Sequence, residues 1–442
     1  MTVKIKIIGA GLAGAEAAYQ CARRGVAVDL YEMRPVRSTP AHQTSDFAEL
    51  VCSNSLKSES ENSAPWVLKQ EMRRAGSLLL DCAHASAVPA GHALAVDRDL
   101  FAKKVTEAIS NAPLITVHRE EVIHIDEDDA NNITVIATGP LTSAALSQEI
   151  ARLSGSTHLY FYDSISPIVD ATTVDRSIVF AASRYDKSLD GTGDYLNCPM
   201  NRAEYEQFLD QLIAAEAVEA HVPDDVPYFE ACLPIEEIAR RGRDTLRFGP
   251  MKPMGLTDPR TGRRPWAAVQ LRQENLRADS FNLVGFQNHL RFGEQKRILR
   301  LIPGLGNAEF LRFGQIHRNT YINAPQLLNS TLQLRAHPNV FFAGQLSGVE
   351  GYVESIATGL VAGRFAARWI AGEVPVALPR QTALGSLCHY ISHADARRYQ
   401  PANIAFDLLP VPDPAPRDRK ERQTMVTERA LTALQAYMTS HV

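Results

Sequence analysis

The stretch VKIKIIGAGLAGAEAAYQCARRGVAVDLYE, residues 3–32, decides the fold. It begins as an apolar strand, continues as an alanine-rich helix that Gly25 is expected to cap, and ends as a second strand. Gly9, Gly11 and Gly14 stand in G-x-G-x-x-G order between the first strand and the helix. This order predicts a βαβ unit, and therefore an α/β fold of the Rossmann type.

The three glycines have separate physical tasks. The first permits a tight turn, the second lets the backbone approach a pyrophosphate, and the third allows the helix to pack closely on the strand. Glu32 ends the second strand, where its carboxylate can accept hydrogen bonds from a ribose. A lone G-x-G-x-x-G is a weak signal, but together with two strands, a helix and a terminal acid it predicts a dinucleotide site. The loop residues expected to contact the dinucleotide are Gly9, Ala10, Gly11, Leu12, Ala13 and Gly14.

Two later segments decide between FAD and NAD. NNITVIATGP, residues 131–140, is an apolar strand that ends in Thr-Gly-Pro, and NVFFAGQLSGVEGYVESIATGLVAG, residues 339–363, is a strand, a glycine-rich turn and a helix of small residues. Alone, each would be a packed strand-helix unit. In this order they resemble the second and third cofactor-contacting segments of glutathione-reductase-type FAD domains, so FAD is the expected cofactor. The residues expected to contact it here are Thr138, Gly139, Gly344, Gln345, Gly348 and Gly351.

Composition indicates an ordinary soluble protein of two or three domains. The chain has 442 residues, of which 45% are hydrophobic and 22% charged. It has no 18-residue apolar run and no charged leader, so neither membrane insertion nor secretion is expected, and a cytoplasmic location is predicted. Six cysteines without a C-x-x-C pair are expected to be reduced thiols, and no metal site is predicted.

Charge is segregated along the chain. Residues 238–300 hold 14 Lys and Arg against 5 Asp and Glu, so the net charge of −4 divides into +9 for this zone and −13 for the remainder. A local basic zone favours docking of a polyanion, although solvated surface arginines would give the same count. The candidates for phosphate contacts are Arg240, Arg241, Arg243, Arg247, Lys252, Arg263 and Arg264.

The middle of the chain is expected to form a separate domain. It holds an apolar pattern typical of an amphipathic helix over 194–218, followed by a Gly/Pro/Arg-rich passage with aromatic anchors. We therefore predict an FAD-binding domain made of residues 1–164 and 331–442, with an α+β substrate domain inserted as residues 165–330.

Cys52 lies in ELVCSNSLKS, residues 49–58, which has no apolar run. We expect a loop at the edge of the cofactor domain, where neighbouring hydroxyl, amide and ammonium donors favour a thiolate. The alternative is an inert loop thiol. A second cysteine, Cys232, stands directly before the basic zone.

Several long stretches carry a more specific resemblance. Together with the glycine-rich segments, the chain resembles the folate- and FAD-dependent tRNA (uracil-5-)-methyltransferase family, TrmFO, from residue 3 to about residue 410. The stretches include ELVCSNSLKS (49–58), CLPIEEIARRGRDTLRFGPMKPMGL (232–256), VGFQNHLRFGEQKRILRLIPGL (284–305), GQIHRNTYINAP (314–325) and FFAGQLSGVEGYVESIATGL (341–360). The match weakens at 399–410, where Ala402, Ala405 and Asp407 depart from the family pattern.

The resemblance implies methylation of the T-loop uridine at position 54 of tRNA. It implies 5,10-methylenetetrahydrofolate as one-carbon donor, reduced FAD as source of reducing equivalents, and NADH or NADPH as reductant. The family's two functional cysteines fall on Cys52 and Cys232. Thiolate addition at C6 of uracil makes C5 nucleophilic, which explains the need for a thiol. We assign this attack to Cys232 and place Cys52 nearer the flavin, although the roles could be exchanged.

Three alternatives keep part of this interpretation. The same chemistry could act on ribosomal RNA, the chain could be a non-catalytic FAD-binding scaffold for tRNA modification, or it could be a flavin oxidoreductase for small molecules. The last would leave the basic zone without a purpose. No membrane and no obligate protein partner are expected.

Overall fold

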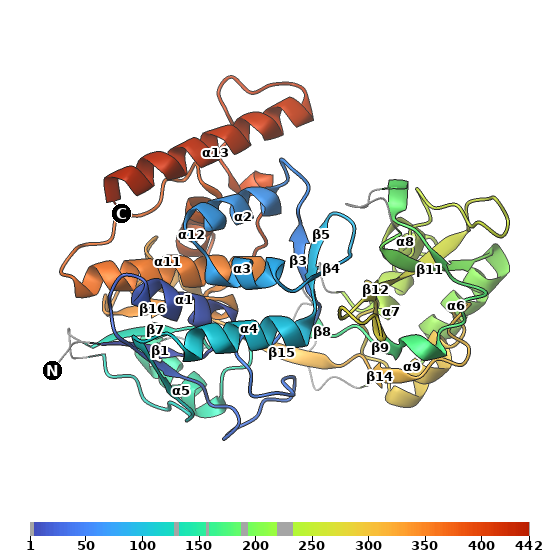
Figure 1. The fold of residues 1–442 in the computed structure, drawn as a ribbon, viewed down its shortest axis with the longest axis horizontal. Coiled ribbons are helices and arrows are strands. Elements are labelled where there is room, and N and C mark those ends of the chain that lie inside the picture. The colour runs from blue at the N-terminus through green and yellow to red at the C-terminus, as the bar shows by residue number, and fades with distance from the viewer. Residues whose placement is uncertain (1–3, 128–131, 156–158, 187–192, 219–232, 442) are drawn as a thin grey trace.

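The computed structural model describes residues 4–127, 132–155, 159–186, 193–218 and 233–441. Figure 1 shows two lobes side by side, one built from both ends of the chain and one, coloured green to yellow, built from its middle. Each lobe has its own large cluster of buried apolar side chains. The functional question is therefore what lies where the two lobes meet.

The lobe built from both chain ends contains a five-stranded parallel sheet in the order β16-β7-β1-β2-β6. Buried β-branched side chains dominate the inner strands β1 and β7, and the edge strand β16 buries a valine and two phenylalanines, as expected for a sheet covered on both faces. The strands are β1 (Ile5–Ile8), β2 (Val28–Tyr31), β6 (Ile115–His118), β7 (Ile133–Ile136) and β16 (Val340–Phe342).

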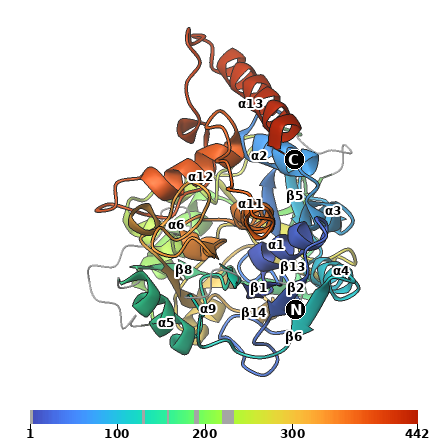
Figure 2. The same cartoon turned by 90° about the vertical axis from the view of Figure 1, so that its left-hand side faces the viewer.

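Two helices pack tightly against each other beside this sheet. They are α1 (Leu12–Ala22), from the N-terminal unit, and α11 (Tyr352–Ile370), from the late segment. Their backbones approach closely because Gly359 and Gly363 face α1: a Cβ on Gly359 would lie 2.2 Å from the carbonyl oxygen of Ala13. Figure 2 shows the two helices together at the centre of the lobe. Segments more than 300 residues apart thus form one unit.

Further helices and a small antiparallel sheet, in the order β3-β5-β4, complete this lobe. In Figures 1 and 2 the C-terminal helix α13 lies outermost, beyond α2. The elements are β3 (Ser55–Ser58), β4 (Ala87–Val88), β5 (Ala93–Val96), α2 (Ala64–Arg74), α3 (Leu78–His84), α4 (Arg98–Ser110), α5 (Ala144–Ser154), α10 (Ala324–Leu327), α12 (Ala383–His393) and α13 (Arg419–His441).

The middle lobe is built on a six-stranded antiparallel sheet in the order β10-β11-β12-β13-β9-β14. Its strands are β9 (Ile168–Asp170), β10 (Phe180–Ala181), β11 (Tyr195–Met200), β12 (Ala267–Gln273), β13 (Ser280–Leu283) and β14 (Phe310–Arg312). Its helices are α6 (Arg202–Ala214), α7 (Ile235–Arg240), α8 (Thr245–Phe248) and α9 (Phe292–Leu299).

A two-stranded antiparallel ribbon lies between the lobes in Figure 1. It pairs β8 (Leu159–Ser164), where the chain leaves the first lobe, with β15 (Ile316–Tyr321), where the chain returns. The predicted domain limits at residues 164 and 330 lie close to these two strands and stay a prediction.

One local expectation was wrong and another is confirmed. Residues 195–200 of the segment predicted as one amphipathic helix form strand β11, which pairs with β12. The helix starts only at Arg202 because Asn201 and Glu204 form a capping box, which defines a helix N-terminus. The expected cap of α1 is confirmed: Gly25 takes a positive φ of 76°, its N–H donates to the carbonyl of Ala22, and the N–H of Val26 donates to the carbonyl of Cys21, which is the bond pattern that ends a helix at a glycine.

None of the helices in the described ranges combines the length and apolarity needed to span a bilayer. Within the same ranges, His, Cys, Asp and Glu side chains form no group of three that could hold a metal ion.

Candidate active site

A cavity of about 320 Å³ lies where the three glycine-rich segments meet. The first segment contributes Gly11, Leu12 and Ala13, at the N-terminus of α1. The strand β7 leads into the second, and the turn before α11 forms the third. The residues from these two segments include Ala137, Thr138, Gly139, Gly344, Gln345, Gly351 and Tyr352. The cavity therefore joins two helix N-termini, whose free N–H groups favour an anionic or electron-rich ligand.

A smaller cavity of about 70 Å³ adjoins the first and shares Gly11, His42 and Thr138 with it. Its wall contains Gly9 and Glu32, at the ends of β1 and β2. The two cavities thus follow the edge of the parallel sheet at the carboxyl ends of its strands, which is where ligands bind in α/β folds.

The glycines fit the tasks expected of them. Gly9 has a φ of 95° and a Cβ there would lie 2.7 Å from the carbonyl oxygen of Ala137. A Cβ on Gly14 would lie 1.7 Å from the carbonyl oxygen of Gly9, so the helix can approach the turn only without one. A Cβ on Gly11 would meet nothing within 4 Å and would project into open space beside both cavities. This is a cradle suited to a pyrophosphate, so the residues present fit FAD.

Glu32 is held as a carboxylate at the smaller cavity. Its Oε2 accepts a hydrogen bond from the N–H of Ala10, and its Oε1 accepts from both the backbone and the guanidinium of Arg34. Burial alone would raise the pKa of Glu32, but the positive charge of Arg34 and the hydrogen bonds from Arg34 and Ala10 together outweigh burial and hold that pKa below its usual value. An ionised acceptor is therefore present for a ribose hydroxyl.

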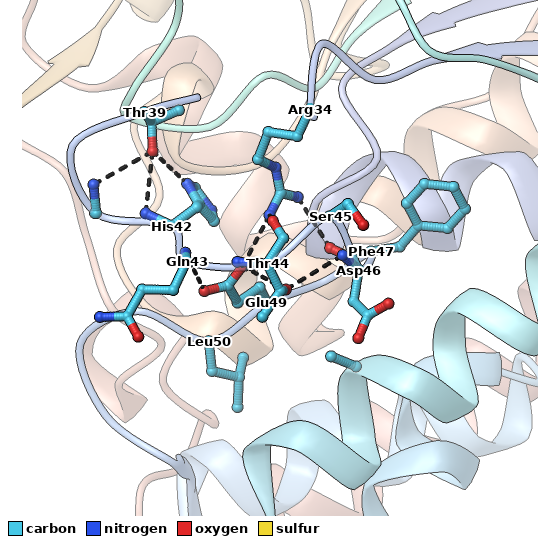
Figure 3. A network of polar contacts seen from close by, with 12 residues as sticks. Arg34, Thr39, His42, Gln43, Thr44, Ser45, Asp46, Phe47, Glu49 and Leu50 are labelled. Atoms are coloured by element: carbon cyan, nitrogen blue, oxygen red, sulfur yellow. Dashed lines mark hydrogen bonds and ion pairs between the residues drawn. The ribbon is translucent and has the colours of Figure 1, made fainter. Parts of the chain in front are cut away.

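Arg34 also organises the loop that follows β2 (Figure 3). Its guanidinium pairs with Glu49 at 2.9 Å and donates to the carbonyl oxygens of Thr44 and Asp46. Glu49 in turn accepts from the backbone N–H groups of Gln43 and Thr44. The loop then returns to the glycine turn, because the N–H of Ala48 donates to the carbonyl of Ala10. The segment 34–50 thereby forms one wall of the cavities and leads directly to Cys52.

Cys52 lies in the wall of the larger cavity, in the loop before β3, and is half-buried. The backbone N–H groups of Cys52 and Ser53 donate to the hydroxyl oxygen of Tyr352, at 2.8 and 3.1 Å. Tyr352 is the first residue of α11, so the thiol is tied to the helix whose N-terminus faces the cavity. Burial and the nearby Cys52 raise the pKa of Tyr352 well above its usual value. The phenol therefore stays protonated while it accepts these two bonds.

Arginines surround the Cys52 loop. Arg98 donates to the carbonyl of Leu50 at 3.0 Å and forms a 2.5 Å ion pair with Glu274. Although burial opposes it, the carboxylate of Glu274 raises the pKa of Arg98. Arg98 and Arg312 both interact electrostatically with Cys52. Cationic neighbours of this kind favour a thiolate.

Lys57 is half-buried and forms an ion pair with the buried Glu354 at the same cavity. Its ammonium lies 2.5 Å from the carboxylate of Glu354 and 2.5 Å from the side-chain oxygen of Asn403. Glu354 also accepts from the N–H of Ile404 at 2.9 Å. This pair joins β3, the first turn of α11 and the C-terminal segment, so three distant parts of the chain support one wall.

The structure brings most of the predicted cofactor residues to the cavities, but three of them line neither. Ala10 contacts Glu32 through its N–H, and Gly14 packs against Gly9. A Cβ on Gly348 would lie 2.1 Å from the hydroxyl of Tyr399, so this glycine makes room for a tyrosine. Their assignment as cofactor contacts stays a prediction.

Cys232 lies outside the described residues. The chain is described again from Leu233, and the N–H of Ile235 donates to the carbonyl oxygen of Gln287 at 2.7 Å. Gln287 lines the larger cavity.

The surplus of the basic zone is partly offset by acids that its count did not include, because Arg240, Arg243 and Arg291 pair with Glu237, Asp210 and Glu216. Four further arginines pair with acids of the zone itself: Arg247–Asp244, Arg260–Asp258, Arg277–Asp279 and Arg297–Glu294. Arg263 and Arg264 are exposed in the turn before β12. Exposed ion pairs are worth little, about 0–1 kcal/mol, so phosphates can replace these acids.

Several residues that line the site were not predicted from the sequence. His42, Gln287, Asn319 and Asn403 line the larger cavity from four separate segments. No spacing rule connects them, since each arrives from its own turn of the fold. Arg34 is different, because it follows Glu32, the acid expected to bind the ribose, by two residues. This local pattern is visible in the sequence, and the structure shows that Arg34 is buried.

Comparison with known proteins identifies the class of protein to which this chain belongs. The family described as Glucose inhibited division protein A matches residues 4–374. The structure of Aquifex aeolicus GidA superimposes with a TM-score of 0.70 over 98% of this chain and 75% of that chain, at 16% identity. The fold and its cavities thus define a protein of the glutathione-reductase-type FAD-binding class.

Close relatives narrow the class. A protein of Koribacter versatilis named methylenetetrahydrofolate–tRNA-(uracil-5-)-methyltransferase TrmFO is 69% identical over 99% of this chain and 98% of its own length. A protein of the same name from Enterococcus faecalis is 54% identical, over 98% of both chains. The chain belongs to the TrmFO family of methylenetetrahydrofolate–tRNA-(uracil-5-)-methyltransferases.

Proposed function

We propose that this enzyme transfers a one-carbon unit from 5,10-methylenetetrahydrofolate to C5 of a uridine in tRNA, at position 54 of the T loop, and reduces it to a methyl group. The observation that carries the proposal is the position of Cys52. It stands in the wall of the cavity that all three glycine-rich segments line, so a thiol and a cofactor site share one space.

FAD would be held by the glycine turn with the N-terminus of α1, by Glu32 at the smaller cavity, and by the turns that hold Thr138, Gly139, Gly344 and Gln345. When bound, FAD supplies the reducing equivalents that convert the transferred carbon to a methyl group, and NADH or NADPH restores them. The protein's own contribution is to fix the cofactor between two helix N-termini and to place a thiol beside it.

A thiol is needed because C5 of uracil is a poor nucleophile. A thiolate that adds to C6 makes C5 electron-rich, and C5 then attacks the methylene carbon. The bonds from this carbon to the two folate nitrogens break in turn, so tetrahydrofolate is the leaving group. Loss of the C5 proton, addition of the hydride equivalent that the reduced cofactor would supply, and expulsion of the thiolate restore the ring with a methyl group at C5. A cysteine suits both steps because it is partly ionised near neutral pH and leaves readily.

We assign the attack on C6 to Cys232 and the position nearer the flavin to Cys52. Support for a role of Cys232 at this cavity comes from Ile235, three residues later, whose N–H donates to the cavity residue Gln287. A Cys232→Ala variant should lose methyl transfer and keep bound flavin. Retained turnover would transfer the nucleophile's role to Cys52.

The proposal is tested by an assay in vitro with 5,10-methylenetetrahydrofolate, NADH or NADPH, and unmodified tRNA transcript, with unmodified ribosomal RNA in a parallel reaction. Each component is omitted in turn, and 5-methyluridine is located by mass spectrometry of nuclease fragments. Product at position 54 only in the complete mixture supports the proposal. Product on ribosomal RNA alone would show that ribosomal RNA, and not tRNA, is the substrate. A flavin-loaded protein that modifies neither RNA would overturn the proposal in favour of a non-catalytic FAD-binding scaffold.

A further inference from the structure

The loop that carries Cys52 is held from both lobes at once. On its N-terminal side, Arg98 of α4 donates to the carbonyl oxygens of Leu50 and Val51. On its C-terminal side, Arg272 of β12 donates to the side-chain oxygens of Ser53 at 2.9 Å and Asn54 at 2.7 Å. Every residue from 50 to 54 thus forms a hydrogen bond with a residue outside the loop, since Cys52 and Ser53 also bond to Tyr352.

The end of β12 is the part of the middle lobe that makes this contact. The side-chain amide of Asn54 donates to the carbonyl of Gln273 at 2.9 Å, and also to the carbonyl of Val96 in its own lobe. Glu274, the next residue after β12, pairs with Arg98. Arg272 and Gln273 therefore bind the loop that carries Cys52, and Glu274 binds Arg98, the arginine that supports this loop. These three consecutive residues all belong to the middle lobe.

These contacts are buried, so they are costly to break one at a time. Arg272 is 7% exposed, Glu274 5% and Asn54 0%. Removal of one partner from a buried hydrogen-bonded set leaves the other polar groups without a partner and without water. A guanidinium also spans two acceptors with fixed geometry, which a flexible ammonium does not.

We propose that Arg272 is a positioning residue for Cys52, so that the thiol keeps its place in the cavity wall only while the end of β12 is docked against the loop. The middle lobe then does more than offer a surface to RNA: it completes the thiol site of the other lobe. The inference goes beyond the proposed function, because it concerns the placement of Cys52 and holds for whatever reaction the thiol serves.

The test measures Cys52 directly, in the flavin-loaded protein without RNA. The rate of alkylation by iodoacetamide is followed at Cys52 by peptide mass spectrometry in the wild type and in Arg272→Met. Loss of both bonds to Ser53 and Asn54 frees the loop, so the rate at Cys52 should rise at least fivefold. The matched control is Arg277→Met, which removes the same charge from an exposed arginine in the turn after β12, and its rate should stay within twofold.

Two further variants keep the test decisive if Arg272→Met does not fold. Arg272→Lys keeps the charge but not the fork, so its rate should lie between those of the wild type and Arg272→Met. Ser53→Ala removes one acceptor and should give a smaller rise. An alkylation rate within twofold of the wild type, or lower, in folded Arg272→Met or in both further variants overturns the proposal. The readout does not depend on methyl transfer, so its failure is distinct from failure of the proposed function.

Discussion

At the scale of single residues, Cys52 combines a fixed backbone with a side chain at a cavity. Its backbone is fixed by Tyr352, and its side chain shares a cavity with the glycine turns. The other described cysteines, Cys21, Cys82, Cys198 and Cys388, are buried, and burial raises the pKa of each thiol. A thiol that reaches a cavity can react as a thiolate, whereas a buried thiol with a raised pKa is inert.

Replacement of Cys52 by alanine should therefore reduce methyl transfer below about 1% of the wild-type rate, in line with the loss of a group used directly in catalysis. Flavin absorbance should be retained, because no predicted cofactor contact changes. Cys82→Ala, at a buried thiol of α3, is the control and should keep nearly full turnover per folded enzyme. Normal turnover of Cys52→Ala would remove Cys52 from the mechanism.

Lys69 gives a prediction about pH. Its ammonium is fully buried, donates to the carbonyls of Leu56 and Lys57 and pairs with Glu59. Burial lowers the pKa of Lys69 from 10.5 to about 8. Between pH 8 and 10.5 the unfolded chain therefore carries a proton that the folded chain lacks, and this group makes the folded state more stable as pH rises.

The free energy of unfolding of the wild type minus that of Lys69→Met should thus increase from pH 8 to pH 10, by at most about 1.4 kcal/mol per pH unit. Urea denaturation at both pH values measures it. Lys103→Met, at an exposed lysine of α4, should show no such trend. A difference that falls with rising pH would contradict the assigned sign.

At the scale of elements, we expect the N-terminus of α1 to decide cofactor binding. Gly11 caps this helix and borders both cavities, and a side chain there would project into the space proposed for the pyrophosphate. Gly11→Val should yield folded but colourless protein.

The control for Gly11→Val is Gly293→Val, in α9 of the middle lobe. A Cβ at Gly293 also meets nothing within 4 Å, but this glycine lines neither cavity. That variant should be purified yellow. Absorbance near 450 nm per mole of protein measures both, and a yellow Gly11→Val protein would contradict the interpretation of the turn.

The success of sequence reasoning differed between elements for physical reasons. The βαβ unit was predictable because glycine spacing and apolar periodicity are local. The strand β11 was not, because Tyr195–Met200 is apolar enough for either structure and its pairing with β12 lies about 70 residues away. The hydrogen bond from Arg272 to Asn54 joins residues 218 positions apart, so no local spacing in the sequence predicts it.

At the scale of the whole molecule, charge count alone overstated the basic surface. Arg243 pairs with Asp210, which lies outside the zone that was counted. Arg263 and Arg264 are adjacent and exposed, and they are the sharper test of the predicted RNA contacts.

Reversal of Arg263 and Arg264 to glutamate should weaken tRNA binding and reduce the slope of log K against log salt by about 2, one for each lost phosphate contact. Filter binding at several salt concentrations measures it. The control reverses Arg397 and Arg398, an adjacent exposed pair in the other lobe, with the same change in net charge. Equal effects of the two double variants would show that only overall charge matters.

Because α1 packs against α11, the lobe that contains both helices can complete its folding only after α11 has been translated. A ribosome completes the strands of the middle sheet by residue 312, whereas β16 and α11 emerge only after residue 339. The lobe that is translated first therefore waits for β16 and α11 before its nucleotide cradle can close, and we expect the prosthetic group to load only after residue 370 has emerged. A nascent chain arrested at residue 330 should expose α1 to protease and take up no flavin.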